Sequence, residues 1–439
     1  MKFVVALLSL SLLGAAAFAQ EPTPAPATES ADQGPSNNPI VTLASQFLEH
    51  DFFNFFLSAN GVYDSQPLTV NGRTVNQGGW GFDGGGGVEA QKRFRDGFIS
   101  LSYRGDYRDY QSRFFPSGTS QSLALAVQKA LNKRWSVTFT ANGGIFLYGG
   151  TYFGAAPTEV NNVQTNPFST ESRFLATGVS LSYRQTRRLS YVLNGEFYLN
   201  RYNLAGAIGS TGVTGSGSVL YRTTARTTMG GTYSHSYFNY QGAVGNATAD
   251  TLVATISHEF TGRWLASASA GATRTDSTGT VRLPVFFETG GMLVPGFVIG
   301  HYHTTRTFPS FQGTLSRPLR RSALSITGGQ GISSGNGVFL ASRNDFVNGY
   351  YSWRQSLRAN LSFGGGFTHL TSVSNNVAFG YTSGSFSAQY AYNFLRHLGA
   401  NVRYEYVRYG NFGSLGSVQD NRLTFGVYFS SKPIPLTLF

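Results

Sequence analysis

Charged and amide side chains recur at every second position in several short segments of this 439-residue chain. They alternate with aliphatic or aromatic residues, the pattern of a β-strand with one polar and one apolar face. Gathered on a shared inner wall, such side chains would hydrate a passage, and their opposite charges would either neutralise one another or set up a field across it. The sequence favours neither alternative. The candidate pore-lining residues are Arg104, Asp106, Glu196, Asn200, Arg403 and Glu405.

Residue sets for covalent or metal chemistry are missing from the sequence. The chain has no cysteine, which excludes a disulfide framework, a thiolate metal site and a cysteine nucleophile. His301 and His303 stand two apart, but no third ligand accompanies them. No Ser, His and carboxylate set has a spacing that would bring its members together. The sequence therefore predicts a protein that is not an enzyme and has neither a cofactor nor a metal.

The composition departs from that of a soluble protein. Charged residues make up 12% of the chain, whereas soluble domains average about 25%. Glycine contributes 54 residues, phenylalanine 36 and tyrosine 24. A mean hydropathy of −0.14 is too polar for a bundle of transmembrane helices, and after the N-terminal segment no apolar run reaches the ~18 residues of a spanning helix. This combination favours a closed β-barrel.

The first residues predict export from the cytoplasm. Lys2 precedes an apolar run over 3–13, and Ala17-Phe18-Ala19 forms a small-x-small cleavage site, as in a secretory signal peptide. We therefore expect residues 1–19 to be a signal peptide. Residues 20–50 form a Pro-rich segment that we expect to be a flexible periplasmic linker and lead-in; its last part, 40–49, is either a short helix or simply the approach to the first strand. The barrel is expected over 51–439.

The same unit repeats along the rest of the chain: a strand, a short basic turn, a second strand, then a longer loop rich in Gly, Ser and Asn. Eight such hairpins, with one strand before them (about 52–63) and one after (about 421–431), give a transmembrane, antiparallel, up-and-down all-β barrel of 18 strands. The alternative is 16 strands, if the weakly apolar hairpin at 219–235 is no hairpin. The short turns are 92–96, 129–134, 184–188, 222–226, 259–263, 317–321, 354–358 and 394–398.

The signal peptide, the hairpin array and the C-terminal aromatic Phe439 together resemble a porin-type β-barrel of the bacterial outer membrane. The resemblance implies a location in the outer membrane of a Gram-negative cell envelope, contact with its lipid, and recognition of the last strand and Phe439 by the barrel-assembly machinery. The sequence departs from that family at Pro433 and Pro435, so we expect the last full strand to end near Ser431. Aromatic residues near strand ends are candidates for interfacial girdles: Trp80, Tyr103, Trp135, Tyr183, Trp264, Tyr351 and Trp353.

The formal net charge is +12, and the short turns hold many of the basic residues. If these turns face the periplasm, they form a basic rim. Two interpretations remain open: solvation and contact with anionic lipid headgroups, or an electrostatic funnel for an anionic solute or polymer. A nucleic-acid partner is not predicted, because no stacking motif accompanies the charge. The rim candidates are Arg93, Arg95, Lys133, Arg187, Arg188, Arg320, Arg321 and Arg358.

Two further segments give predictions about local structure. The connection 275–308 is the longest and is unusually apolar; it would either fold inward as a constriction, with Phe286, Phe287 and Glu288 as candidates, or project as an extracellular hairpin. The run of four glycines at 84–87 lacks the context of a phosphate-binding loop, and we expect a tight bend or bulge there.

Three functions are compatible with these features. The first is a channel for passive diffusion of small hydrophilic, and by the rim charge anionic, solutes. The second is a barrel that exports a polysaccharide or other polymer. The third is a structural barrel that does not conduct. No oligomeric state follows from the sequence.

Overall fold

The computed structural model describes residues 51–431 except for 66, 71–72, 77, 112–116, 147–170, 204–207, 261–263, 290–291, 320, 334–340, 374–379 and 411–417. The predicted signal peptide, linker and Phe439 lie outside the described residues, so these three expectations stay predictions. Within the described part, no helix is long and apolar enough to cross a membrane.

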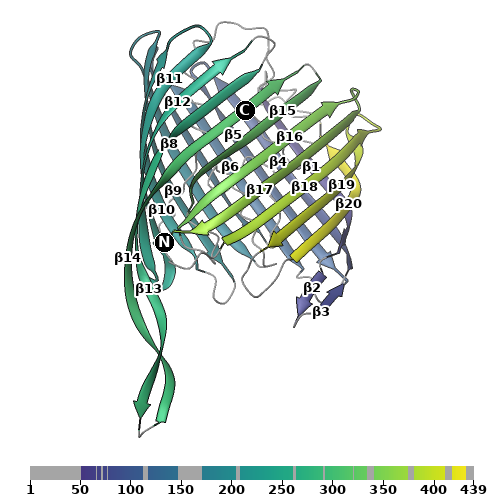
Figure 1. The fold of residues 1–439 in the computed structure, drawn as a ribbon. Coiled ribbons are helices and arrows are strands. Elements are labelled where there is room, and N and C mark those ends of the chain that lie inside the picture. The colour runs from purple at the N-terminus through teal and green to yellow at the C-terminus, as the bar shows by residue number, and fades with distance from the viewer. Residues whose placement is uncertain are drawn as a thin grey trace.

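Eighteen antiparallel strands form one closed sheet (Figure 1). Each strand pairs with its neighbours in sequence, and β1 closes the barrel by pairing with both β20 and β4. The first nine are β1 (Phe52–Asp64), β4 (Gly79–Phe94), β5 (Gly97–Tyr110), β6 (Gly118–Ala130), β7 (Trp135–Phe146), β8 (Ser172–Arg184), β9 (Leu189–Tyr202), β10 (Ser210–Arg222) and β11 (Thr227–Tyr240). The other nine are β12 (Gly245–Glu259), β13 (Leu265–Thr289), β14 (Met292–Pro318), β15 (Ser322–Ser333), β16 (Ser342–Arg354), β17 (Ala359–Ser372), β18 (Gly380–Asn393), β19 (Leu398–Gly410) and β20 (Val418–Ser430).

The prediction of 18 strands is confirmed, and the hairpin formed by β10 and β11 settles the choice between 18 and 16. All eight predicted short turns join paired strands, so they lie at one rim together with the start of β1 and the end of β20. Among the described connections, β2 (Pro67–Val70) and β3 (Arg73–Asn76) pair with each other, and a 3-10 turn covers Gln241–Ala243.

Several of the short turns share a local hydrogen-bond pattern. In the turn after β8, the Thr186 hydroxyl accepts hydrogen bonds from the backbone N–H groups of Arg188 (3.2 Å) and Leu189 (3.0 Å). In the turn after β16, the Ser356 hydroxyl likewise accepts hydrogen bonds from the backbone N–H groups of Arg358 (3.1 Å) and Ala359 (3.0 Å). A short polar side chain that satisfies its own turn backbone stabilises a tight reversal. The neighbouring basic residues are not needed for the reversal and remain exposed.

Over most of the wall, apolar side chains lie outside and polar ones inside, although the outer face of β11 and β12 also carries the exposed pair His235 and Asp250. On β20, Leu423, Phe425 and Val427 are exposed, while the residues between them face inward. This arrangement suits a barrel surrounded by lipid, because the hydrocarbon contacts the outer apolar side chains and the closed ladder satisfies the backbone. Two of the predicted girdle aromatics contact each other: Trp135, at the start of β7, stacks on Tyr183 with ring centroids 4.5 Å apart.

The four glycines at 84–87 do not form the predicted bulge. Strand β4 keeps an uninterrupted register with both β1 and β5 through this run, so that prediction was wrong. The reason for the glycines is close packing. A Cβ on Gly87 would lie 2.2 Å from the carbonyl oxygen of Tyr103 and 2.6 Å from the ring of Phe56, which is buried.

Candidate pore-lining site

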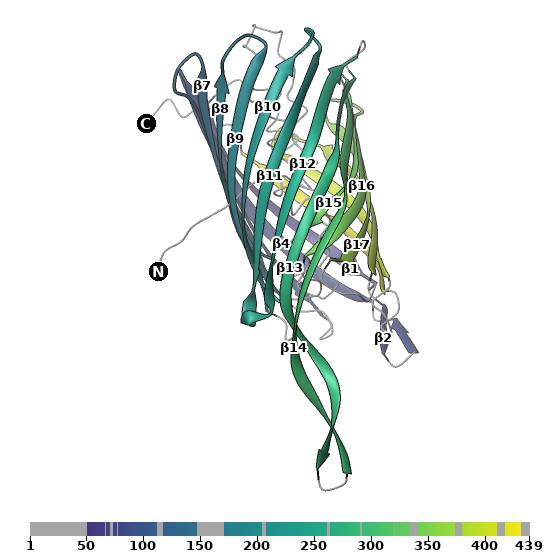
Figure 2. The ribbon, with the colours of Figure 1, turned by 60° about the vertical axis from the view of Figure 1, so that its left-hand side comes forward.

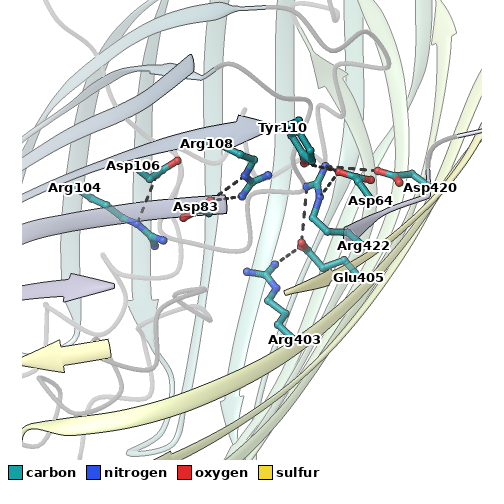
Figure 3. Close-up of polar contacts among 10 residues, drawn as sticks. All are labelled: Asp64, Asp83, Arg104, Asp106, Arg108, Tyr110, Arg403, Glu405, Asp420 and Arg422. Atoms are coloured by element: carbon teal, nitrogen blue, oxygen red, sulfur yellow. Dashed lines mark hydrogen bonds and ion pairs between the residues drawn. The ribbon is translucent and has the colours of Figure 1, made fainter. Parts of the chain in front are cut away.

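Strands β19, β20, β1, β4 and β5 are consecutive around the barrel and carry a network of ionisable side chains on the inner face of the wall, called the ionised wall below (Figure 3). The alternation of the strands puts them there. On β19, Arg403 and Glu405 are largely buried. Val402 and Tyr404, which alternate with them along the strand, are exposed on the outside. The charges therefore face the lumen, not the lipid.

Arg422 on β20 is the centre of one half of this network. Its guanidinium lies 2.9 Å from Asp64, at the end of β1, and also contacts Asp420 at 3.6 Å and Glu405 at 3.9 Å. Glu405 in turn pairs with Arg403. The carboxylate of Asp64, almost wholly buried, also accepts a hydrogen bond of 2.8 Å from the Tyr110 hydroxyl.

The other half of the network lies on β4 and β5. Arg108 donates to one oxygen of Asp83 through two nitrogens, at 2.6 and 2.9 Å, and these residues are register partners on the two strands. Arg104 and Asp106 form a looser pair, 4.0 Å apart. Figure 3 shows Tyr110 between Arg108 and Arg422, so the two halves form one continuous charged wall.

Glycines on β4 leave room for the looser pair. Gly85 is the register partner of Asp106, and Gly87 is the register partner of Arg104. Neither position adds a side chain to the inner face at that height. The ring of Phe56 packs against Gly87, and the side chains of Arg104 and Asp106 stay 41% and 22% exposed.

The wall half-way around the barrel is rich in hydroxyl groups, with Glu196 of β9 as a charged neighbour. Hydroxyl groups pair across neighbouring strands on β10 to β13: Thr214 with Ser236, Ser218 with Thr232, and Thr251 with Thr273, each at 2.9 Å. Asn194 on β9 donates to Ser216 at 3.1 Å. The lumen is thus asymmetric, with an ionised wall facing a wall of hydroxyl groups.

A small apolar cluster lies inside the barrel near the rim of the longer loops. Phe238 and Tyr240 of β11 pack there with Ala247 and Ala249 of β12 and with Ala341, which precedes β16. Because β11 and β16 are not neighbours in the sheet, the cluster joins distant parts of the wall.

The structure brings four of the six predicted pore-lining residues into the ionised wall, namely Arg104, Asp106, Arg403 and Glu405. Glu196 and Asn200 lie apart from them on β9, with the inward parity of the buried Asn194. Sequence reasoning missed Asp64, Asp83, Arg108, Tyr110, Asp420 and Arg422. Arg108 continues the spacing of Arg104 and Asp106 at every second position, and this pattern could have found it.

The remaining predicted site residues lie at the two ends of the barrel. Seven of the eight rim candidates are exposed at or beside the short turns, and Arg320 lies outside the described residues. The backbone of Phe286, Phe287 and Glu288 belongs to β13, in the long hairpin with β14 that extends beyond the barrel (Figure 1). Of the two arrangements left open for 275–308, the structure has the projecting hairpin. Among the described residues, no group of three or more His, Asp or Glu side chains could hold a metal ion.

The architecture decides the class of protein. An even number of antiparallel strands in a closed barrel, with short turns at one rim, an apolar outer face and aromatic residues near strand ends, is the layout of bacterial outer-membrane barrels. The chain is a porin-like β-barrel of the bacterial outer membrane. Lipid therefore surrounds its outer wall.

Comparison with known proteins gave similarities in structure only. No protein-family model matches the sequence, and no curated protein matches it. Among solved structures, the chain is similar to OpdO of Pseudomonas aeruginosa, with 13% identity, a TM-score of 0.39, and 87% of this chain and 97% of that one covered. It is also similar to OccAB4 of Acinetobacter baumannii (8% identity, TM-score 0.40, 87% and 99% covered) and to a BenF-like porin of Pseudomonas fluorescens Pf-5 (11%, 0.41, 87% and 99%).

Proposed function

We propose that the barrel is a channel through which small hydrophilic solutes diffuse passively across the outer membrane, without a catalytic step. The observation that carries the proposal is the closed 18-stranded wall with a hydrophilic inner face. Barrels of 16–18 strands are wide enough to hold an aqueous channel. The paired charges and hydroxyl groups of the lumen keep such a channel hydrated without binding a solute tightly.

The two ends of the proposed path differ in charge. The ionised wall has four arginines (Arg104, Arg108, Arg403 and Arg422) and five carboxylates, so it gives no excess of positive charge. The exposed basic residues of the short turns do give an excess of positive charge. We therefore assign the preference for anionic solutes to the periplasmic rim, where a field of several kT would raise the local concentration of anions.

The test is uptake into proteoliposomes by osmotic swelling, with a neutral sugar and a sugar acid of similar size. The rim variant carries Arg187→Gln, Arg188→Gln, Arg321→Gln and Arg358→Gln. We expect faster entry of the acid than of the sugar in the native protein, and loss of that difference in the variant, with sugar entry unchanged.

A matched control is Arg274→Gln, which removes an exposed base from the middle of β13, away from the rim. It should leave both rates unchanged. An equal preference for the acid before and after the rim substitutions would refute the role of the rim and support contact with lipid headgroups. Absence of swelling with every solute would refute the channel itself.

The basic rim also favours a second candidate, export of an anionic polymer delivered from the periplasm. The same assay separates the two. A diffusion channel admits small solutes without any other component, whereas an exporter that opens only for its polymer would exclude them.

A further inference from the structure

Strands β13 and β14 are far longer than the rest, with 25 and 27 residues. They pair with each other from Leu265 and Ser316 to Thr289 and Met292 without a break in register. Beyond the barrel they continue as a twisted two-stranded ribbon that projects from the rim of the longer loops (Figures 1 and 2).

The neighbouring strands stop where the ribbon leaves the wall. β12 pairs with β13 only up to Gly279, and the Thr280 N–H donates to the carbonyl oxygen of Val244 at 2.8 Å. On the other side, β15 pairs with β14 only from Phe311 onward. In the described part of the chain, Val281–Thr289 therefore pair only with Met292–Gly300, and β14 from Met292 to Ser310 has β13 as its only strand partner.

Such a ribbon presents two open sheet edges. Along each edge, alternate backbone N–H and C=O groups point away from the partner strand and can accept another strand. A two-stranded ribbon alone in water is only marginally stable, and a third strand is usually needed. Proteins protect open edges with charges, bulges or very short strands. This ribbon is long, and its register contains no bulge.

The two edges differ in sequence. Val281–Thr289 contains Arg282 and Glu288, whereas the segment of β14 from Met292 to Gly300 contains no charged residue. Pro295 removes one donor from that segment, and its other residues keep theirs. The edge of β14 is therefore the one that lacks any charge to repel an approaching strand.

We propose that this edge of β14 pairs with the same edge of a second copy of the chain. A two-fold axis through the edge sets the two segments antiparallel, which is the isologous contact of a symmetric dimer. The uncharged segment then meets itself without like-charge repulsion. Every copy in the membrane carries its ribbon at the same height above the barrel, so the edges are at matching levels. The result is a four-stranded sheet outside the barrel, independent of whether the barrel conducts.

The absence of native cysteine allows a clean crosslinking test. Single substitutions Val294→Cys, Gly296→Cys, Val298→Cys, Gly300→Cys and Tyr302→Cys are oxidised in proteoliposomes at low protein density. A disulfide forms only where two Cα atoms lie about 4.4–6.8 Å apart. We expect the yield of disulfide-linked dimer to be highest at the position nearest the two-fold axis and to fall at the positions on either side.

The control is Asn239→Cys, which is exposed near the same rim but lies on β11, a strand that is paired on both sides. It should give only the background of random collision. No dimer at any ribbon position, or a uniform yield equal to that of Asn239→Cys, would overturn the proposal.

Two further variants test the pairing without crosslinks. Replacing 282–298 by two glycines should leave a barrel whose gel mobility still changes on heating, but whose mass in detergent is that of a monomer. Val298→Lys puts like charges into the contact and should lower the dimer fraction in an otherwise intact chain. A dimer that survives either change would overturn the proposal.

Discussion

Replacement of Arg422 by glutamine tests whether the ionised wall is one interdependent network. The guanidinium lies 2.9 Å from Asp64, and the two side chains are only 13% and 2% exposed. It also stands within 4 Å of Glu405 and Asp420, at 3.9 and 3.6 Å. Its loss removes much of the positive charge that faces the three neighbouring carboxyl groups.

The magnitude follows from burial. Two unit charges about 4 Å apart interact by about 4 kcal/mol at an effective dielectric constant of ~20. Breaking a buried pair from one side typically costs about 3–5 kcal/mol. We therefore expect Arg422→Gln to lower the free energy of unfolding by about 3 kcal/mol or more. Asp64→Asn should lower it as well, and the double variant should lose less than the sum of the two.

The assay is urea unfolding in lipid vesicles, followed by the gel mobility of the folded form. Arg173→Gln is the control. Arg173 lies 2.6 Å from Glu171, closer than Arg422 is to Asp64, but its side chain is 62% exposed. That exposed pair should contribute less than about 1 kcal/mol. If Arg422→Gln changes stability no more than Arg173→Gln does, or if the two substitutions of the cycle are simply additive, the network account is wrong.

Two other predictions concern packing and polar pairs in the wall. Gly87→Ala should destabilise the barrel by about 1–3 kcal/mol, because the new Cβ overlaps the Tyr103 carbonyl and the Phe56 ring. The control is Gly195→Ala, at a position with open space around it. Equal midpoints of urea unfolding for the two variants would contradict the packing argument. Ser218→Ala alone should cost about 1–3 kcal/mol, because it leaves the buried Thr232 hydroxyl without its partner. The double variant Ser218→Ala with Thr232→Val should recover most of that loss, and a double variant less stable than the single one would contradict the pairing.

The sequence was sufficient to predict the barrel, because its repeat is local. Each short turn has at least one basic residue between two alternating segments, and this pattern can be recognised without knowledge of the rest of the chain. The long hairpin was harder. Alternation in 275–308 is weak, and nothing local tells whether an apolar ribbon will turn into the lumen or away from it.

The ionised wall was predicted only in part, because strand ends and barrel closure are not local. Asp420 was missed because the last strand was predicted from about 421, whereas β20 begins at Val418; Arg108 and Tyr110 belong to β5, which runs to Tyr110. The pairing of Asp64 with Arg422 joins the first strand to the last, and only closure of the barrel brings them together. The glycine run at 84–87 marks close packing in a regular strand, which cannot be told from a bulge without its neighbours.

Single-channel recording of the purified protein in a planar bilayer tests the central claim most directly. A lumen lined by hydrated charges and hydroxyl groups predicts steady stepwise conductance, proportional to voltage and to salt concentration, with a mild anion preference that the rim substitutions reduce. A protein that inserts in the folded form, verified by its change of gel mobility on heating, and yet remains silent would contradict the account of an open diffusion channel.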